Sequence, residues 1–233
     1  MNWFAAFPRS SSDSASLTRE LAPLLAETVE LVFWSHETGW DPALEQHGEV
    51  RVYDAGMPPW GDFNRAPLTL FHLGDDFESF GPIWTISRRL PGIVTLHAES
   101  LQPFLTRLVA QKRFLTVLEY LGLSEFHHPG AGRTMGELYL RDQITLDELS
   151  ARCPLDGAAA ANALAVLRPV PSKDAFLTTL LAAIEDLPQH EAAWCARVMS
   201  RRVGEAIAGW SGVRPKPELL PRIQRAIAEL NAA

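Results

Sequence analysis

The chain has 233 residues, of which 47% are hydrophobic, and its formal net charge at pH 7 is −7. This is enough apolar material for one large or two small domains with a real core. Because no block of lysine or arginine interrupts the acidic balance, the chain offers no electrostatic surface for nucleic acid or for an anionic membrane, although an anionic ligand could bind locally.

The sequence predicts a cytoplasmic protein without a transmembrane segment. Its first residues, MNWFAAFPRSS, lack the basic flank and the long apolar core of a signal peptide. The longest nearly apolar stretch, AAAANALAVL at 158–167, is too short to span a bilayer and contains an asparagine. Cys153 and Cys195 lie far apart without metal-ligand spacing, so we expect both to be reduced thiols.

The first hundred residues alternate between strand-like and helix-like segments. We expect strands at five short apolar runs, 2–7, 29–34, 50–53, 68–73 and 93–97. The apolar spacing predicts helices at 14–27 and 77–90. Strands that alternate with helices imply a parallel sheet, and nearly continuous apolar strands fit burial on both faces of that sheet. This half of the chain therefore predicts an α/β domain.

After residue 100 the pattern becomes helical. We expect one long helix at 102–121, a break rich in glycine and proline, and then helices at 134–142, 145–152, 156–167, 172–187, 190–210 and 217–231. Thr145 and Glu148 have the spacing of a capping box. The helix at 190–210 has an apolar face formed by Met199, Val203, Ile207 and Trp210. We expect this face to contact either the intrachain core or a partner, which is a second copy or a different protein. An all-helical extension thus follows the α/β domain.

Two of the predicted strands end in a histidine. The chain reads LFHLGDDF at 70–77 and IVTLHAES at 93–100, which places His72 and His97 at strand ends. In parallel sheets, ligands bind outside the carboxyl ends of the strands. Because neighbouring strand ends share one rim, we expect both side chains to point into one concavity, with Trp60 or Trp34 as an aromatic wall.

Three stretches carry a family resemblance: FPRSSSDSASLTRELAPLLA at 7–26, NRAPLTLFHLGDDFESFGPIWTISRRLPGIVTLHAESL at 64–101 and YLRDQITLDELSARCPLDGAAAANALAVL at 139–167. In order and spacing they resemble segments of the bacterial family 4 glycosyltransferases of the GT-B type. There, one strand ends in His-Leu-Gly-Asn and the next in Leu-His-Asp. The resemblance implies a Rossmann-like GT-B N-terminal (acceptor-side) domain at 1–121, linker helices at 122–171 and a C-terminal helical extension at 172–233.

The chain departs from the family pattern in three ways. The donor-binding half, which needs roughly 150 further residues of alternating strands and helices, has no counterpart after the predicted linker. The glycine of the family's first loop is replaced by Asp13, and a carboxylate repels a phosphate at that position. The aspartate of the Leu-His-Asp motif is replaced by Ala98, with Glu99 beside it as a displaced substitute.

The resemblance implies a catalytic role for His97, near the transferred sugar. It implies substrate binding by His72, Gly74, Asp75, Trp60, Glu99 and Asp13. For His97, the alternative is a strand-end histidine that bonds a nearby carbonyl group. For His72 and Gly74, it is a tight turn from strand to helix.

The aspartates and the aromatic residue also have structural alternatives. Two carboxylates at the start of a helix, here Asp75 and Asp76, are more typical of capping than of metal binding. Trp60 and Phe63 suit a sugar ring, but aromatic residues in a proline-rich loop more often seal a sheet edge.

Two functions therefore remain open from the sequence. One is the acceptor-side half of a GT-B glycosyltransferase for glycan or polysaccharide synthesis, completed by a partner chain that binds the donor. The other is a catalytically inactive relative that acts as an adaptor or scaffold. We expect a possible sugar acceptor and either a homodimer or a donor-domain partner protein. We expect no nucleic acid, no metal and no cofactor.

Overall fold

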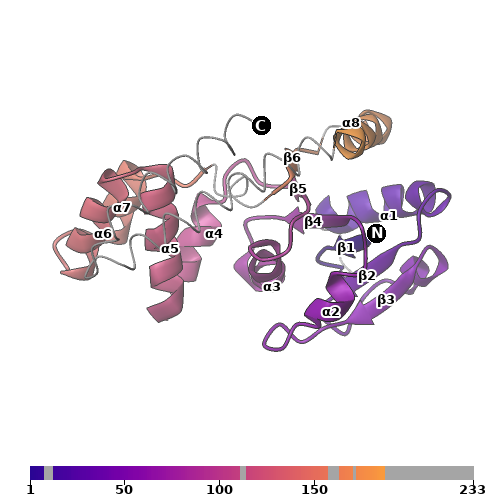
Figure 1. Ribbon diagram of the computed structural model, residues 1–233, viewed down its shortest axis with the longest axis horizontal. Coiled ribbons are helices and arrows are strands. Elements are labelled where there is room, and N and C mark those ends of the chain that lie inside the picture. The colour runs from indigo at the N-terminus through magenta and orange to yellow at the C-terminus, as the bar shows by residue number, and fades with distance from the viewer. Residues whose placement is uncertain (8–12, 111–113, 157–162, 170–171, 187–233) are drawn as a thin grey trace, which may run out of the picture. The chain divides into compact units, whose positions relative to one another are not determined.

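The computed structural model describes residues 1–7, 13–110, 114–156, 163–169 and 172–186. Six parallel strands form one sheet in the spatial order β3-β2-β1-β4-β5-β6 (Figure 1). The strands are β1 (Asn2–Phe4), β2 (Val32–Ser35), β3 (Glu49–Val52), β4 (Thr69–Leu73), β5 (Ile93–Leu96) and β6 (Ala165–Leu167). Helices flank the sheet, so the fold is Rossmann-like, and the direction of strand order reverses between β1 and β4.

The helices follow the predicted pattern in part, and the short helices η1 and α2 were not predicted. They are α1 (Asp13–Ala26), η1 (Pro42–Gln46), α2 (Trp60–Phe63), α3 (Phe77–Ser87), α4 (Gln102–Ala110), α5 (Phe114–His127), α6 (Ala131–Leu140), α7 (Leu146–Arg152) and α8 (Lys173–Glu185). The helix predicted at 102–121 corresponds to α4 and the first part of α5, and residues 111–113 between them lie outside the described residues. Helix α4 contacts α3 beside the sheet, whereas α5 makes its most extensive contacts with α6. The two ends of the predicted helix therefore pack against different neighbours, α3 and α6.

The parallel sheet and the five predicted strands are confirmed, but β6 is a correction. The alanine-rich segment 156–167 is predicted to be helical, whereas Ala165–Leu167 pairs in parallel with β5. The amide of Leu164 also donates to the carbonyl oxygen of Gly92, at 2.8 Å. Local sequence favours a helix here, but β5 would otherwise present a row of unpaired backbone groups, and pairing with it overrides the local preference. The sheet therefore includes a strand from far beyond residue 121.

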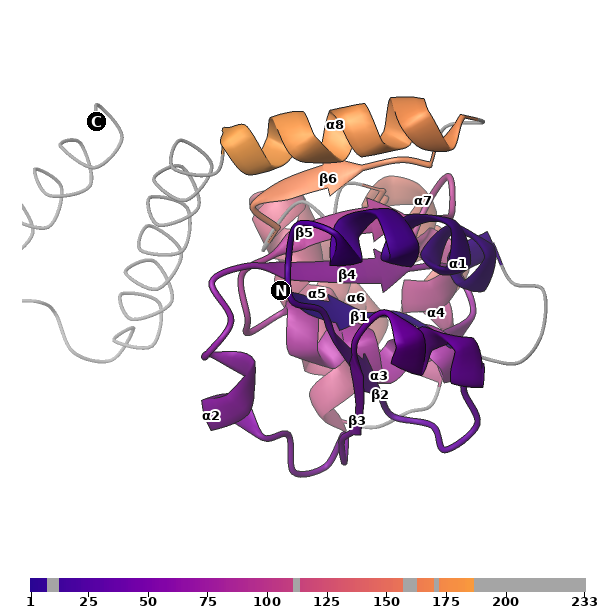
Figure 2. The ribbon, with the colours of Figure 1, turned by 90° about the vertical axis from the view of Figure 1, so that its right-hand side faces the viewer.

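Aromatic side chains fill both faces of the sheet, because successive residues of a strand point to opposite sides. On one face, Phe4 stacks on Trp34 and on Phe71, with ring centroids 6.2 and 5.0 Å apart. On the other, Trp3 lies 5.7 Å from Phe33. Buried residues of α3 belong to the cluster around Phe4, and Figure 2 shows α1 on the opposite side of the sheet. The core thus has two layers, one on each face.

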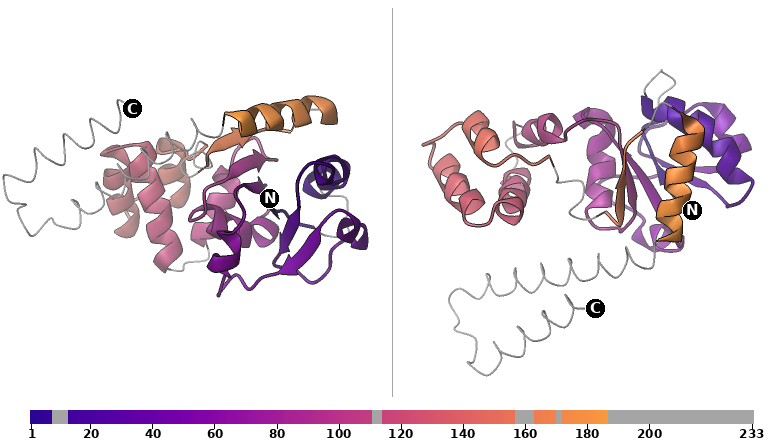
Figure 3. Two further views of the ribbon diagram at one scale, coloured as in Figure 1. Left: turned by 45° about the vertical axis from the view of Figure 1, so that its right-hand side comes forward. Right: turned by 90° about the horizontal axis from the view of Figure 1, so that it is seen from above.

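Helices α5, α6 and α7 form a separate helical group beside α4 (Figure 3). The predicted capping box at the start of α7 is confirmed: the Glu148 amide donates to Oγ1 of Thr145 at 3.2 Å, and the Thr145 amide donates to the Glu148 carboxylate at 2.8 Å. Helices α5 and α6 approach very closely at Gly132, where a Cβ atom would lie 2.3 Å from the backbone of Ser124. Only glycine fits at this crossing.

The chain divides into two compact units, residues 1–180 and 181–233. The helices predicted at 190–210 and 217–231 lie outside the described residues, so their apolar faces remain predictions. Among the helices that the structure describes, none is long and apolar enough to cross a membrane.

Candidate functional site

Three neighbouring strands end side by side at the carboxyl edge of the sheet. Strand β4 is followed by Gly74, β5 by His97 and β6 by Arg168. A surface pocket of about 260 Å³ lies at the ends of β5 and β6, lined by Leu96, His97, Ala98, Glu99, Arg168 and Pro169. This is the edge at which open α/β sheets bind ligands.

His72 and His97 are directly hydrogen-bonded, with 2.8 Å between Nδ1 of His72 and Nε2 of His97. Their rings are nearly parallel, at an angle of 24° with centroids 5.1 Å apart. Because one nitrogen must donate and the other must accept, the bond requires opposite protonation at these two atoms. Pairing of β4 with β5 makes the two histidines neighbours. The expectation that both side chains point into one concavity is not met, because His97 lines the pocket whereas His72 is fully buried.

His72 belongs to the protein interior rather than to the rim. It lies within β4 and is fully buried, with Trp3 stacked on its ring at 5.3 Å. Burial, and then the proximity of His97, hold the pKa of His72 well below its usual value, so it is neutral near pH 7. Its Nε2 is buried and has no hydrogen-bond partner among the described residues. A substrate in the pocket would meet His97 before it could reach His72.

His97 is half-buried and lies between His72 and the pocket. Its amide donates to the Leu73 carbonyl oxygen at 2.7 Å, which continues the β4–β5 ladder by one residue. Its Nε2 is engaged by His72 and its Nδ1 is also buried. In this conformation Nε2 is bonded to His72 and Nδ1 is shielded from solvent, so neither nitrogen is placed to take a proton from a ligand. Proton transfer to a ligand would require the ring to turn away from His72.

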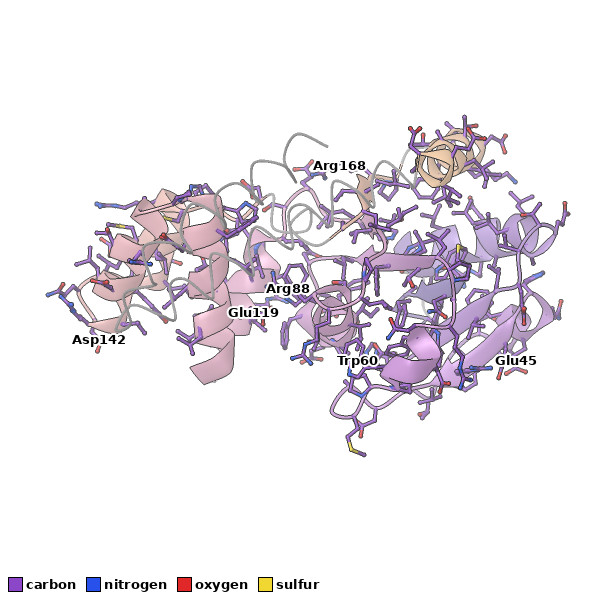
Figure 4. The ribbon with its side chains drawn as sticks, viewed as in Figure 1. Glu45, Trp60, Arg88, Glu119, Asp142 and Arg168 are labelled. Carbon is purple, nitrogen blue, oxygen red and sulfur yellow. The ribbon has the colours of Figure 1, made fainter. Side chains whose placement is uncertain are left out.

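Arg168 holds the loop that follows β5. Its Nη1 donates to the carbonyl oxygen of Ala98 at 3.0 Å and its Nη2 to that of Glu99 at 2.9 Å. The Glu99 side chain is exposed at the same pocket, as is Arg168 (Figure 4). The sequence pattern missed Arg168, because a helix was predicted up to residue 167 and the following RPVP gave no sign of a strand end. Only the pairing of β6 with β5 brings residue 168 to residues 98 and 99.

Gly74 and the two aspartates form the turn from β4 into α3. A Cβ atom at Gly74 would lie 2.5 Å from the Phe80 ring, so the absence of a side chain lets this ring pack against the turn. Asp76 caps α3 by accepting a hydrogen bond from the Ser79 amide at 3.0 Å, and this bond lowers the pKa of its carboxyl. The capping interpretation is therefore confirmed for Asp76. Asp75 is exposed beside it.

The two tryptophans predicted as a wall lie elsewhere. Trp60, labelled in Figure 4, begins α2. Its ring is perpendicular to that of Phe63, and the Arg89 guanidinium lies 5.9 Å from its centroid. Trp34 is buried in β2, and its Nε1 donates to the Asn2 side chain at 2.9 Å. It lines a different pocket, of about 250 Å³, at the amino edge of the sheet. The contacts of Trp60 with Phe63 and Arg89 agree with the alternative that this tryptophan packs against the protein rather than against a sugar.

Two further expectations concern Asp13 and metal binding. Asp13 is the first residue of α1, which follows β1 at the point where strand order reverses. Its side chain lies outside what the structure describes. Among the described residues, no group of three or more histidine, cysteine, aspartate or glutamate side chains is arranged to hold a metal ion.

No protein-family model matches this chain. Searches of curated proteins and of solved structures also give no match. The case for a family therefore depends on the three resembling stretches and on the geometry described above.

Proposed function

We propose that this chain is the acceptor-side domain of a GT-B-type glycosyltransferase that acts in glycan or polysaccharide synthesis. The Rossmann-like sheet supports this, since such sheets are the building units of GT-B enzymes. Strand β4, which contains His72, and strand β5, which His97 follows, are adjacent in that sheet, as the resembling segments imply. The donor-binding half would come from outside these 233 residues.

The observation that carries the proposal is the pocket at the ends of β5 and β6. It combines polar and apolar groups of the kind that bind a sugar: the Glu99 carboxylate and the Arg168 guanidinium beside Leu96 and Pro169. Its volume of about 260 Å³ falls just below the range of about 300–1,000 Å³ usual for drug-sized ligands. The pocket therefore suits a single sugar ring rather than an extended ligand.

In this proposal His97 acts on an acceptor hydroxyl group only after its ring turns toward the pocket. A neutral imidazole can then accept the hydroxyl proton as the acceptor oxygen bonds to the anomeric carbon of the donor sugar, and the bond from that carbon to the donor's phosphate breaks, so that the nucleotide leaves. His72 would hold the resting orientation through its 2.8 Å hydrogen bond. Asp75 and Trp60 have no assigned part in this step.

Binding of simple glycosides tests the proposal directly. We would titrate ¹⁵N-labelled protein with methyl glycosides and follow the amide resonances of residues 97–99. We expect millimolar binding that shifts these amides, and His97→Ala should weaken it. His47→Ala, a histidine that follows η1, is the matched control and should leave binding unchanged. Absence of shifts with every glycoside would reject the proposal.

Binding of a nucleotide-sugar provides a second test, which asks whether this chain binds the donor substrate. With Asp13 at the start of α1 and no donor-binding half, this chain should bind such a ligand weakly or not at all. Micromolar affinity in calorimetry would show that the assignment to the acceptor side is wrong.

One observation favours a different function, a catalytically inactive relative that serves as an adaptor or scaffold. Both ring nitrogens of His97 are withdrawn from the pocket, one of them into the bond with His72. A histidine pair that serves only to stabilise the fold would have the same arrangement. In that case His97→Ala should lower the melting temperature without affecting any glycoside, because the pair would contribute only to stability.

A further inference from the structure

We propose that Arg168 is a specificity-determining residue, which binds the carboxylate or phosphate group of an acidic sugar in the pocket at the ends of β5 and β6. This inference rests on the proposed function and narrows its acceptor to sugars that carry a negative charge. It concerns a residue that the resemblance leaves without a role.

Among the residues that the structure describes, no acidic side chain forms an ion pair with Arg168. In the described part of the chain, ion pairs with carboxylates are formed by other arginines: Arg19, Arg51, Arg65, Arg88, Arg107 and Arg141. Arg168 instead contacts two carbonyl oxygens, which carry only partial charges. A guanidinium ion held in this way keeps a full positive charge available for a ligand.

The guanidinium group is also held in place before a ligand arrives. Its two hydrogen bonds, at 3.0 Å to Ala98 and 2.9 Å to Glu99, orient the planar group against the loop. Arginine has five N–H donors, and two of them bond to atoms of the described residues, which leaves three that no described residue engages. Because the group is already oriented, less side-chain entropy is lost when an anion binds. Guanidinium groups bind carboxylates and phosphates in charge-assisted hydrogen bonds.

The rest of the pocket indicates a sugar rather than a bare anion. The Glu99 carboxylate lines the same pocket and would repel an ion without hydroxyl groups. The same carboxylate accepts hydrogen bonds from sugar hydroxyls. Leu96 and Pro169 add apolar surface, which the C–H face of a ring can cover. A ring with several hydroxyls and one acidic substituent satisfies all of these groups together.

The test compares matched probes on the intact chain by the same NMR titration. The probes are methyl β-glucuronide, glucose 1-phosphate, neutral methyl β-glucoside and inorganic phosphate. We expect the two acidic sugars to bind more tightly than the neutral one, and their affinity to fall as sodium chloride is added. Comparison of the two acidic sugars shows whether the pocket prefers a carboxylate or a phosphate.

Three variants separate charge from geometry. Arg168→Gln should weaken both acidic sugars by about tenfold to a hundredfold and leave methyl β-glucoside unchanged. Arg168→Lys keeps the charge but loses the planar fork, so its effect should be intermediate. Arg133→Gln, an exposed arginine on α6, makes the same change of net charge and should alter nothing. Thermal melts establish that each variant is folded.

The inference is overturned if Arg168→Gln and Arg168→Lys bind the acidic sugars as tightly as the unmodified chain. It is also overturned if inorganic phosphate binds as tightly as glucose 1-phosphate, because the pocket would then not recognise a sugar. Binding of methyl β-glucoside with equal affinity to the acidic sugars would reject the inference and leave the proposed function intact. If no sugar binds, both fail.

Discussion

His72 in β4 and His97 after β5 share a hydrogen bond of 2.8 Å, with the first ring fully buried and the second at the edge of a pocket. The bond connects the interior of the sheet to its carboxyl edge. Since Trp3 stacks on His72 from within the same face, three aromatic rings lie in series between the core and the pocket. The stability of the core and the orientation of His97 are therefore coupled.

Removal of the buried ring should destabilise the fold. His72→Ala would leave a cavity beside Trp3 and remove the partner of His97 Nε2. We expect a loss of about 2–4 kcal/mol in the free energy of unfolding, measured by urea denaturation. His47→Ala should change this free energy by less than about 0.5 kcal/mol. Equal midpoints for the two variants would show that the His72 ring contributes nothing to stability.

Stability should also depend on pH through His72. Its pKa is lowered in the folded state, mainly by burial, so the unfolded chain binds this proton more readily. The stabilisation is complete above the unfolded pKa of about 6.5 and is lost as the pH falls below that value toward the folded pKa. The slope from this group should reach about 1.4 kcal/mol per pH unit.

A variant that cannot titrate isolates this contribution. His72→Gln should show a shallower loss of stability between about pH 6.5 and 5, although it is less stable overall. His36 and His127 also have lowered pKa values through burial, but they are present in both proteins and cancel in the comparison. Parallel curves of stability against pH would contradict the assignment of a depressed pKa to His72.

Two glycines in the helical group should respond in opposite directions to the same change. Gly132→Ala places a methyl group 2.3 Å from the Ser124 backbone, so α5 and α6 must separate. We expect a cost of about 1–3 kcal/mol, or failure of this group to pack. Gly122→Ala in α5 meets nothing within 4 Å and should stabilise the protein by about 0.5–1 kcal/mol. Chemical denaturation of both variants, followed by circular dichroism, measures the two effects; a similar response from both would contradict the close helix crossing.

The capping box of α7 gives a local prediction. Thr145→Ala removes the oxygen that accepts the Glu148 amide, and we expect a cost of about 1 kcal/mol, with faster hydrogen exchange in α7. Thr178→Ala is the control, because that hydroxyl donates to the Asp174 carbonyl within α8 and caps no helix start. If exchange in α7 stays unchanged while the control behaves as expected, the cap does not stabilise this helix.

The sequence by itself determined the elements whose signals are local. Short runs rich in apolar residues predict β1 to β5, of which β1, β4 and β5 are fully buried, and helical spacing predicts α1 and α3. The caps at Asp76 and Thr145 were also predictable, since a cap depends on residues only three positions apart. Even the proximity of His72 and His97 followed from sequence, because consecutive parallel strands are usually neighbours in the sheet.

The tertiary structure alone decided which distant groups meet. Ala165–Leu167 is locally compatible with a helix, and only the open edge of β5 makes it a strand. That pairing brings Arg168 against Ala98 and Glu99, some 70 residues earlier in the chain, and creates the pocket. The packing of Trp60 against Phe63 and Arg89 was equally hidden. Sequence patterns indicate which local conformation is favoured. The edge strand β6 and the pocket depend instead on contacts between residues that are distant in sequence and meet only when the chain folds.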